Sequence, residues 1–207
     1  MGITFHNKPI PEPYTIYVQN FNFERYIEYA HEDINCELLD GVLTIHSPAS
    51  LEHELIFKFL LTLLDLYIQE KKLGLVVGSR FTMKLSSKWA PEPDIMYIAA
   101  SDIKDKLKET YLDGPATVIF EILSQSTRED DLNKKLPKYL ASGVKEVWII
   151  DPLEKHLTIY WKEANSNTYK EIEWAISKFI PGFRIKVDWL WKTKSISVIE
   201  KFREMKE

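Results

Sequence analysis

Cysteine is nearly absent from this 207-residue chain, which contains only Cys36. A single cysteine excludes an intramolecular disulfide and any zinc site built from several cysteines. The N-terminus lacks a basic segment followed by an apolar one, so the sequence predicts no signal peptide. These features are typical of a protein kept in a reducing compartment, and we expect a cytoplasmic location.

Long hydrophobic runs are missing as well. The longest apolar stretch, residues 55–67, is interrupted by Lys58 and Asp65 and is too short to cross a bilayer. We therefore expect a core helix there and no membrane partner.

The chain also has no excess of positive charge. Its net charge of −4 gives no general attraction to DNA, because such binding depends largely on Lys and Arg neutralising phosphates. Affinity for DNA would have to come from a local basic cluster. Three candidates, each of a kind that is usually just a solvated surface, are Lys71-Lys72, Lys104-Lys106-Lys108 and Lys134-Lys135-Lys138.

What the chain does contain is the composition of an ordinary globular domain, with 45% hydrophobic and 28% charged residues. At this length one domain with a sizeable core is expected. We predict an irregular, Pro-rich N-terminal arm over residues 1–20 that packs on a partner, a domain over residues 21–191, and a C-terminal helical extension over residues 192–207. No internal repeat or low-complexity tract interrupts this division.

The local patterns predict a mixture of helices and strands. A short helix is expected at Phe21–Tyr29, and a hairpin over residues 37–46 around the turn dipeptide Asp40-Gly41. Strand-like runs cover residues 74–78, 81–85, 95–100, 116–123 and 147–152, and a second hairpin joins residues 157–161 and 168–172 around a turn at 165–167.

Two acidic residues stand out against these runs. Asp94 follows two prolines at the entrance of the strand 95–100, where an ordinary turn residue is the alternative interpretation. Glu121 is the only ionisable residue of the run 116–123, which is apolar enough to be buried on both faces. An unpaired carboxylate there would cost several kcal/mol, so it must be neutralised, paired or bound to a metal. Converging carboxylates are candidates for a hard divalent cation such as Mg²⁺.

A helix is predicted between these acids and the next strand. Ser126 or Thr127 caps it, and it runs to about residue 142, with Pro137 expected to bend its axis. Lys135 lies beside its apolar face and is placed to reach back toward the end of the Glu121 strand, although a solvated lysine is the alternative. Strand, helix and strand over residues 116–151 predict a βαβ unit with a right-handed crossover.

The joint pattern of these residues resembles the Uma2 family. The resemblance rests on Pro93-Asp94, Phe120-Glu121-Ile122-Leu123-Ser124-Gln125-Ser126-Thr127, Asp131, Lys135, Tyr139 and the run from Gly143 to Pro152, together with the hairpin Cys36–Leu43 and with Ser47-Pro48 followed by His53. It covers roughly residues 20–190. It implies an α/β fold of the restriction-endonuclease-like PD-(D/E)XK class, with a central mixed β-sheet flanked by helices.

The resemblance also implies a Mg²⁺-dependent (or Mn²⁺-dependent) DNA endonuclease. It assigns the metal to Asp94 and Glu121, with the backbone carbonyl of Ile122. The general fold carries its catalytic lysine two residues after the second acid, where this chain has Leu123. The resemblance therefore implies that Lys135 supplies the positive charge from the following helix.

The first long helix offers three further candidates, Glu52, His53 and Glu54, of which at most one or two can face the site because neighbouring helical positions point about 100° apart. His53 is alternatively a satisfied, partly buried histidine.

A second function remains open beside the nuclease. A nuclease-derived binding or assembly module without catalysis is compatible with Leu123 and with the acidic net charge, and it predicts that Lys135 points to solvent or that Glu121 is paired with an internal cation. A hydrolase of another phosphoester is a third possibility, since the same metal site would serve it. A homodimer is expected by analogy only, because cutting both strands often uses two active sites.

Overall fold

The computed structural model describes residues 4–5, 8–9, 11–30, 34–78, 80–161 and 165–206. Its helices are α1 Phe23–Tyr29, α2 Leu51–Lys71, α3 Ala100–Lys106, α4 Arg128–Asp130, the π-helical turn η1 Asp131–Lys135, α5 Leu136–Ser142, the 3₁₀ helix η2 Val187–Trp191 and α6 Val198–Lys206. Its strands are β1 Thr4–Phe5, β2 Lys8–Pro9, β3 Thr15–Val18, β4 Cys36–Leu39, β5 Val42–His46, β6 Gly74–Gly78, β7 Thr82–Lys84, β8 Ile95–Ala99, β9 Tyr111–Asp113, β10 Val118–Ile122, β11 Glu146–Asp151, β12 His156–Tyr160, β13 Ser166–Lys170, β14 Trp174–Ile176 and β15 Arg184–Lys186.

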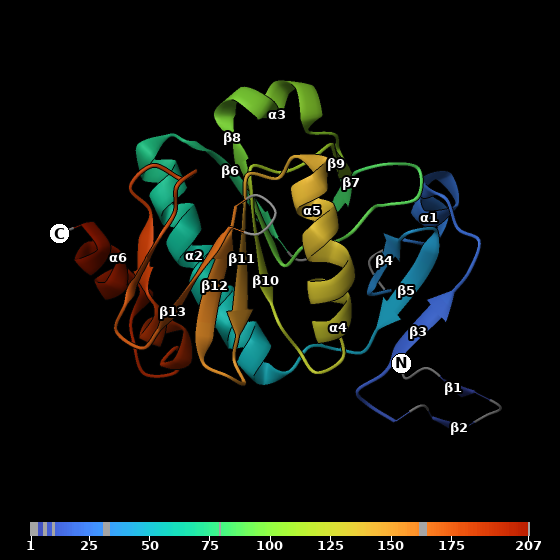
Figure 1. Cartoon of the computed structure of the whole chain (residues 1–207), viewed down its shortest axis with the longest axis horizontal. Coiled ribbons are helices and arrows are strands. Elements are labelled where there is room, and N and C mark those ends of the chain that lie inside the picture. Colours follow the sequence, from blue (N-terminus) through green and yellow to red (C-terminus); the bar gives the residue numbers. More distant parts are fainter. Residues whose placement is uncertain are drawn as a thin grey trace.

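A six-stranded sheet in the order β13-β12-β11-β10-β8-β6 forms the centre of the molecule (Figure 1). Strands β10 and β11 are parallel, whereas the other neighbours are antiparallel. Helix α2 lies on one side of this sheet and α5 on the other, with α6 packed against α2 (Figure 1). The predicted α/β class, with a mixed sheet and flanking helices, is confirmed.

Strand β10 divides the core between the two faces of the sheet. Phe120 and Ile122 join the larger core around α2, whereas Ile119 and Leu123 join the core beneath α5. Side chains alternate between the faces of a strand, so Glu121 shares the α5 face with Ile119 and Leu123. The period of the strand thus directs the buried carboxylate toward the helix that follows it.

The predicted core helix is the 21-residue α2, which starts at the cleft described below. The Ser50 side chain caps it by accepting a hydrogen bond from the N–H of His53, and Lys72 ends it in the left-handed conformation. Its buried face consists of Ile56, Phe59, Leu60, Leu63, Leu64, Tyr67 and Ile68. Among the described residues, no helix is both long enough and apolar enough to cross a membrane.

The helix predicted from residue 127 to 142 is present, but it widens in the middle. The N–H of Leu136 bonds to the carbonyl of Asp131, five residues earlier, which makes residues 131–135 a π-helical turn. Pro137 follows directly; it lacks an N–H, and its ring would clash with the carbonyl four residues earlier in a regular α-helix. The wide turn relieves that clash, so the predicted bend takes the form of a π turn at Asp131–Lys135.

A separate three-stranded sheet, in the order β3-β5-β4, stands beside α5 (Figure 1). The predicted hairpin forms β4 and β5, and its turn residues Asp40 and Gly41 both have positive φ, 52° and 78°, as a tight type I′ turn requires. The prediction that residues 1–20 are irregular is wrong for Thr15–Val18, which pairs with β5 as β3. The prolines of residues 1–20 all precede Thr15, so every residue of β3 keeps a backbone N–H that can pair.

Other differences concern short elements. Strands β9, β14 and β15 have three residues each, too few to show a period in the sequence. The second predicted hairpin exists as β12 and β13, but the turn expected at 165–167 is wrong for residues 166 and 167, which already belong to β13. Residues 162–164 lie outside the described residues. The C-terminal helix is present as α6.

Candidate active site

A cleft of about 1850 Å³ opens between the three-stranded sheet and the ends of β10 and β11. Every side chain singled out as a candidate from the sequence lines it, together with the backbone segment of Ile122: Glu52, His53, Glu54, Asp94, Glu121, Ile122 and Lys135. The fold therefore brings these positions to one place, although they span more than 80 residues of sequence.

Asp94 sits immediately before β8, at the mouth of this cleft. The pairing of β10 with β8 ends at Phe120 and Ile95, and beyond it the N–H of Ile122 donates to Asp94 Oδ2 over 2.7 Å. His53 Nε2 lies 3.2 Å from the same oxygen. The Asp94 side chain is 25% exposed, so this carboxylate is open to a ligand in the cleft.

Glu121 is buried and accepts three hydrogen bonds. Its Oε1 receives the Tyr139 hydroxyl at 2.6 Å and Lys135 Nζ at 2.9 Å, and its Oε2 receives the backbone N–H of Asp94 at 3.1 Å. Burial, together with the charges of Asp131 and Asp94, raises the pKa of Glu121 to about 8, although Lys135 opposes the rise. The backbone N–H of Asp94 thus ties this residue to the Glu121 carboxylate, while the Asp94 carboxylate accepts from the N–H of Ile122.

Lys135 lies inside the protein and is only 4% exposed. Its Nζ is 2.9 Å from Glu121 Oε1, 2.9 Å from Asp131 Oδ1 and 3.4 Å from Glu37 Oε2. Burial disfavours the charged ammonium, but these three carboxylates outweigh it and raise the pKa of Lys135 well above its ordinary value. Lys135 is therefore a permanent buried cation at the end of β10.

This arrangement bears on both functions considered from the sequence. A lysine pointing to solvent, one form of the non-catalytic alternative, is not observed. The other form, an internal cation paired with Glu121, is observed, and Lys135 itself is that cation. An ammonium held against a metal-binding carboxylate also matches the nuclease, so the ion pair alone does not separate the two functions.

The remaining predicted residues differ in what they contact. Leu123 packs in the core with Leu136 and Tyr139 and also lines the cleft, so the position that carries the lysine in the general fold presents an apolar side chain there. Glu52 and Glu54 are exposed at the cleft edge, whereas His53 bonds to Asp94. Burial lowers and the Asp94 carboxylate raises the pKa of His53, with a net upward shift. Of the three helix candidates, the structure places His53 against the predicted metal carboxylate.

Four residues of the site were not proposed from the sequence as its members: Glu37, His46, Asp131 and Tyr139. Asp131 and Tyr139 carried part of the Uma2 resemblance but were given no role in the site. The spacing of four between Asp131 and Lys135 was a signal for an ion pair, whereas nothing local revealed that the Tyr139 hydroxyl reaches Glu121. Glu37 and His46 carried no local signal, because their importance depends on contacts between distant segments.

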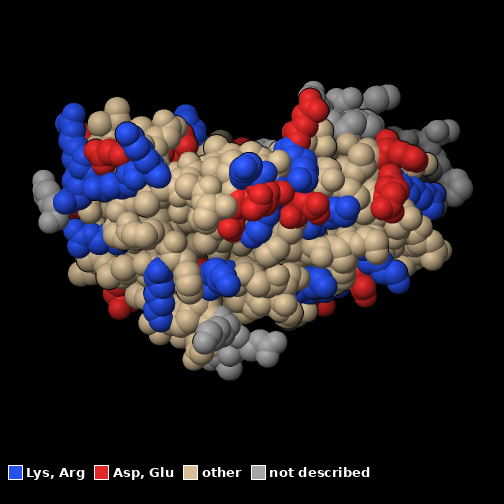
Figure 2. Space-filling view, turned by 90° about the horizontal axis from the view of Figure 1, so that it is seen from above, with Lys and Arg blue, Asp and Glu red and all other residues tan. Residues whose placement is uncertain are grey.

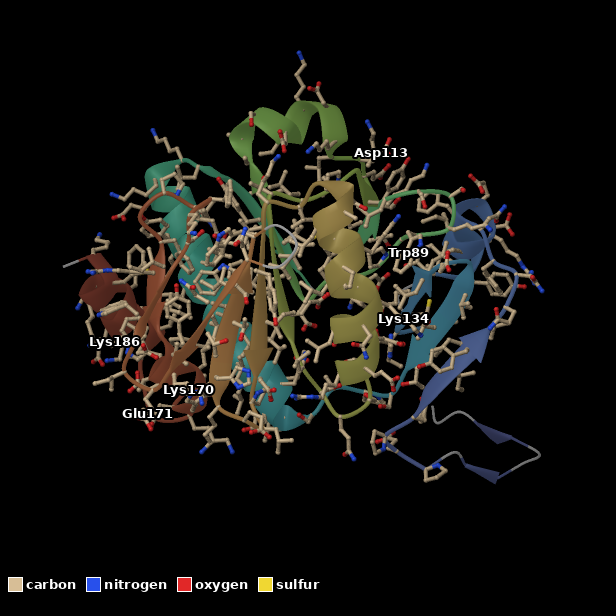
Figure 3. All side chains as sticks on the ribbon, viewed as in Figure 1. Trp89, Asp113, Lys134, Lys170, Glu171 and Lys186 are labelled. Atoms are coloured by element: carbon tan, nitrogen blue, oxygen red, sulfur yellow. The ribbon has the colours of Figure 1, made fainter. Side chains whose placement is uncertain are left out.

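The three-stranded sheet is fastened to the helix that carries Lys135. The Tyr17 hydroxyl donates to Asp130 Oδ2 at 3.1 Å, and Thr15 Oγ1 donates to the carbonyl of Ser126 at 3.2 Å. Lys134 lies between the helix and this sheet (Figure 3), with its Nζ 5.0 Å from the centre of the Tyr17 ring. These contacts fix one wall of the cleft against the other.

The cleft offers a small set of oxygen ligands for a divalent metal. Among the described residues, no three His, Cys, Asp or Glu side chains form a cluster able to hold a metal by themselves. Mg²⁺ is usually bound by one or two carboxylates, with water and substrate phosphate completing its six oxygens. Asp94 and Glu121 supply two carboxylates, and the Ile122 carbonyl faces the same edge as its N–H, which bonds to Asp94. This oxygen set fits Mg²⁺ or Mn²⁺ better than zinc.

Residues 23–188 match the Uma2 family, whose description reads "Putative restriction endonuclease". Among solved structures, the chain is similar to a putative nuclease from Anabaena variabilis, with a TM-score of 0.71 and 15% identity over 84% of this chain and 98% of that one. At this identity the similarity shows the fold, and it confirms the predicted restriction-endonuclease-like architecture. No curated protein matches the sequence.

Proposed function

Because this chain belongs to the Uma2 family of restriction-endonuclease-like proteins, we propose that it is a metal-dependent nuclease that hydrolyses phosphodiester bonds of DNA. The observation that supports this best is the meeting of Asp94, Glu121 and Lys135 in one cleft, with the Asp94 N–H on Glu121 and the Lys135 ammonium 2.9 Å from it. Two acids and a cation gathered at the end of adjacent strands supply the groups that metal-assisted phosphodiester hydrolysis needs.

Each residue has a distinct task in this proposal. Asp94, Glu121 and the Ile122 carbonyl would hold Mg²⁺, which when bound polarises a phosphate and lowers the pKa of a water. Lys135 would stabilise the negative charge that develops on the phosphate. Tyr139 and His53 fix the orientation of the two carboxylates by hydrogen bonds to Glu121 Oε1 and Asp94 Oδ2.

The surface charge suggests where DNA would have to approach. On the side where α3 lies, basic and acidic side chains are interspersed and form no continuous basic surface (Figure 2). In the cleft, Arg128 is 39% exposed on its side chain and is held by Asp151 over 2.6 Å. We propose that binding relies on the metal and on a few such cations, since metal ions add positive charge where the carboxylates gather.

A non-catalytic binding or assembly module is the second candidate. Two observations favour it: Lys135 and Tyr139 already occupy Glu121 Oε1, and Leu123 occupies the usual lysine position. In this case the buried cluster would serve stability, and the cleft would bind a partner without cleaving it.

Glu121→Gln separates the two candidates when compared with wild type and with Glu146→Gln. Glu146 is another fully buried acid, at the opposite end of β10–β11, where it accepts hydrogen bonds from Trp148, Ser177 and Lys178. For a nuclease, Mn²⁺ affinity measured by calorimetry should fall about tenfold or more in Glu121→Gln, and nicking of supercoiled plasmid should disappear. Glu146→Gln should lose stability but keep both properties. A folded wild type that neither binds Mn²⁺ nor nicks DNA would leave the non-catalytic module.

We further propose that the nuclease acts as a homodimer, because cleavage of both strands is most simply achieved by two sites related by a twofold axis. Light scattering on the purified protein should then give twice the chain mass of 24.3 kDa. A monomeric mass that persists in the presence of duplex DNA and Mn²⁺ would contradict this arrangement.

A further inference from the structure

The three-stranded sheet contributes one buried acid to the cleft, Glu37 of β4, which is 3% exposed. Its carboxylate contacts three different segments. Oε1 lies 2.9 Å from His46 Nε2 on β5, and Oε2 lies 3.2 Å from the backbone N–H of Glu92 and 3.4 Å from Lys135 Nζ. A single side chain therefore connects the outer sheet, the Pro-rich run before Asp94 and the helix of Lys135.

These contacts keep Glu37 ionised. Burial opposes its ionisation, but Lys135 and His46 outweigh burial and lower the pKa of Glu37 to about 2. The other two carboxylates around the ammonium behave differently, because burial raises the pKa of both Glu121 and Asp131. Of the three carboxylates around Lys135, Glu37 is thus the one that stays ionised down to the lowest pH.

The geometry also separates Glu37 from Asp131. Asp131 lies one turn before Lys135 on the same helical segment, so their ion pair moves with that helix. Under the proposed function Glu121 would also hold the metal, and its contact with the ammonium would then weaken because the metal would compete for its oxygens. Among the described residues, Glu37 is the one carboxylate that contacts the ammonium from outside the helix and has no proposed metal to bind.

We propose that Glu37 is a positioning residue, which holds the Lys135 ammonium at the end of β10 and anchors the segment that leads into Asp94. This inference rests on the proposed nuclease function and extends it: the outer sheet is part of the active site, although none of its side chains is among the residues proposed to hold the metal. The distance of 3.4 Å and the shared bond to the N–H of Glu92, two residues before Asp94, carry the assignment.

The test compares wild type, Glu37→Gln and the control Glu146→Gln in three measurements. The first is acetylation of Lys135 by limiting acetic anhydride, followed by mass spectrometry and normalised to the neighbouring Lys134, whose side chain is 47% exposed. The second is the Mn²⁺ dissociation constant, and the third is the cleavage rate at saturating DNA and Mn²⁺.

In Glu37→Gln we expect Lys135 to become several-fold more reactive, kcat to fall about 10- to 100-fold as for other residues that orient a catalytic group, and Mn²⁺ affinity to stay at the wild-type value. Glu146→Gln should leave all three unchanged despite its lower stability. If Glu37→Gln does not fold, Glu37→Asp keeps the negative charge but withdraws it from Lys135, and it should show the same changes to a smaller degree.

Wild-type Lys135 reactivity in folded Glu37→Gln or Glu37→Asp would overturn the proposal. So would an equal rise in Glu146→Gln, because the rise would then report general loosening, or a loss of Mn²⁺ binding in parallel with activity, because Glu37 would then act on the metal. If wild type does not cleave DNA at all, the proposed function fails, but the acetylation measurement still decides whether Glu37 positions Lys135.

Discussion

Lys135→Met is expected to remove cleavage and to destabilise the protein strongly. Loss of the ammonium leaves Glu37, Glu121 and Asp131 buried without their common cation. Removal of one partner from a buried ion pair costs ~3–5 kcal/mol, because the remaining charge is uncompensated. Cleavage should fall about 10²- to 10³-fold even in molecules that remain folded, since one group that stabilises transition-state charge is lost.

The destabilisation should depend on pH in a defined direction. Without Lys135, the largest influence that opposes burial is lost and the pKa of Glu121 and Asp131 rises further, so the folded variant holds protons that the unfolded chain has released. Stability is then retained at low pH and lost as the pH rises from the ordinary carboxyl range through these raised values. Urea unfolding should show a larger loss at pH 8 than at pH 5.

Lys134→Met is the matched control for this variant. Lys134 is adjacent and pairs with Asp130, but its side chain is 47% exposed. Asp130 is buried but keeps the hydrogen bond from the Tyr17 hydroxyl, and a half-exposed lysine contributes less to stability than a fully buried one. This substitution should therefore cost much less stability than Lys135→Met and leave cleavage nearly unchanged. Equal stability of the Lys135→Met and Lys134→Met variants at pH 8 would contradict the role of Lys135 as the buried counter-ion.

Affinity for Mn²⁺ is expected to increase about 50-fold between pH 6 and pH 8. The pKa of Glu121 is raised to about 8, so at lower pH its carboxyl carries a proton that a metal must displace. One proton released per metal bound gives about a tenfold change in affinity for each pH unit below the pKa, and the curve should level off above pH 8.

Calorimetry in buffers with different ionisation enthalpies measures both the affinity and the number of protons released. Glu121→Gln carries no proton at this position, so its residual binding should lose most of the pH dependence. A dissociation constant for wild type that is the same at pH 6 and pH 8 would show that Glu121 is not a metal ligand.

The sequence predicted those parts of the fold that have local causes. The apolar stretch of α2, the Asp40-Gly41 turn and the apolar run around Glu121 each have a composition or a turn residue that specifies a conformation. The side-chain cap predicted at Ser126 or Thr127 is wrong, because Thr127 stands at the cap position without a capping hydrogen bond from its side chain. Strand β3 was missed because nearby prolines dominated the pattern, whereas its pairing depends on the free edge of β5. Strand propensity near a proline-rich segment predicts the conformation poorly when a neighbouring strand offers hydrogen bonds.

The residues of the candidate site also differ in whether the local sequence marks them. Asp94, Glu121 and Lys135 were identifiable because each breaks a local pattern or matches the Uma2 motif. Glu37 was not, because it lies in an ordinary hairpin and gains its role only from Lys135, a residue far along the chain. The π turn at residues 131–135 also had no direct signal beyond Pro137, and it helps to set where the lysine points.

The contact between β3 and α4 can form only late in the synthesis of the chain. Tyr17 and Asp130 lie 113 positions apart, and the cleft needs groups from both regions as well as Lys135. A growing chain on the ribosome therefore carries no assembled site until the segment beyond Lys135 has emerged and closed this long loop, a slow step compared with local helix formation. Under the proposed function, a chain that stalls before Lys135 has emerged would be inactive, because it lacks the ammonium that Glu37, Glu121 and Asp131 surround.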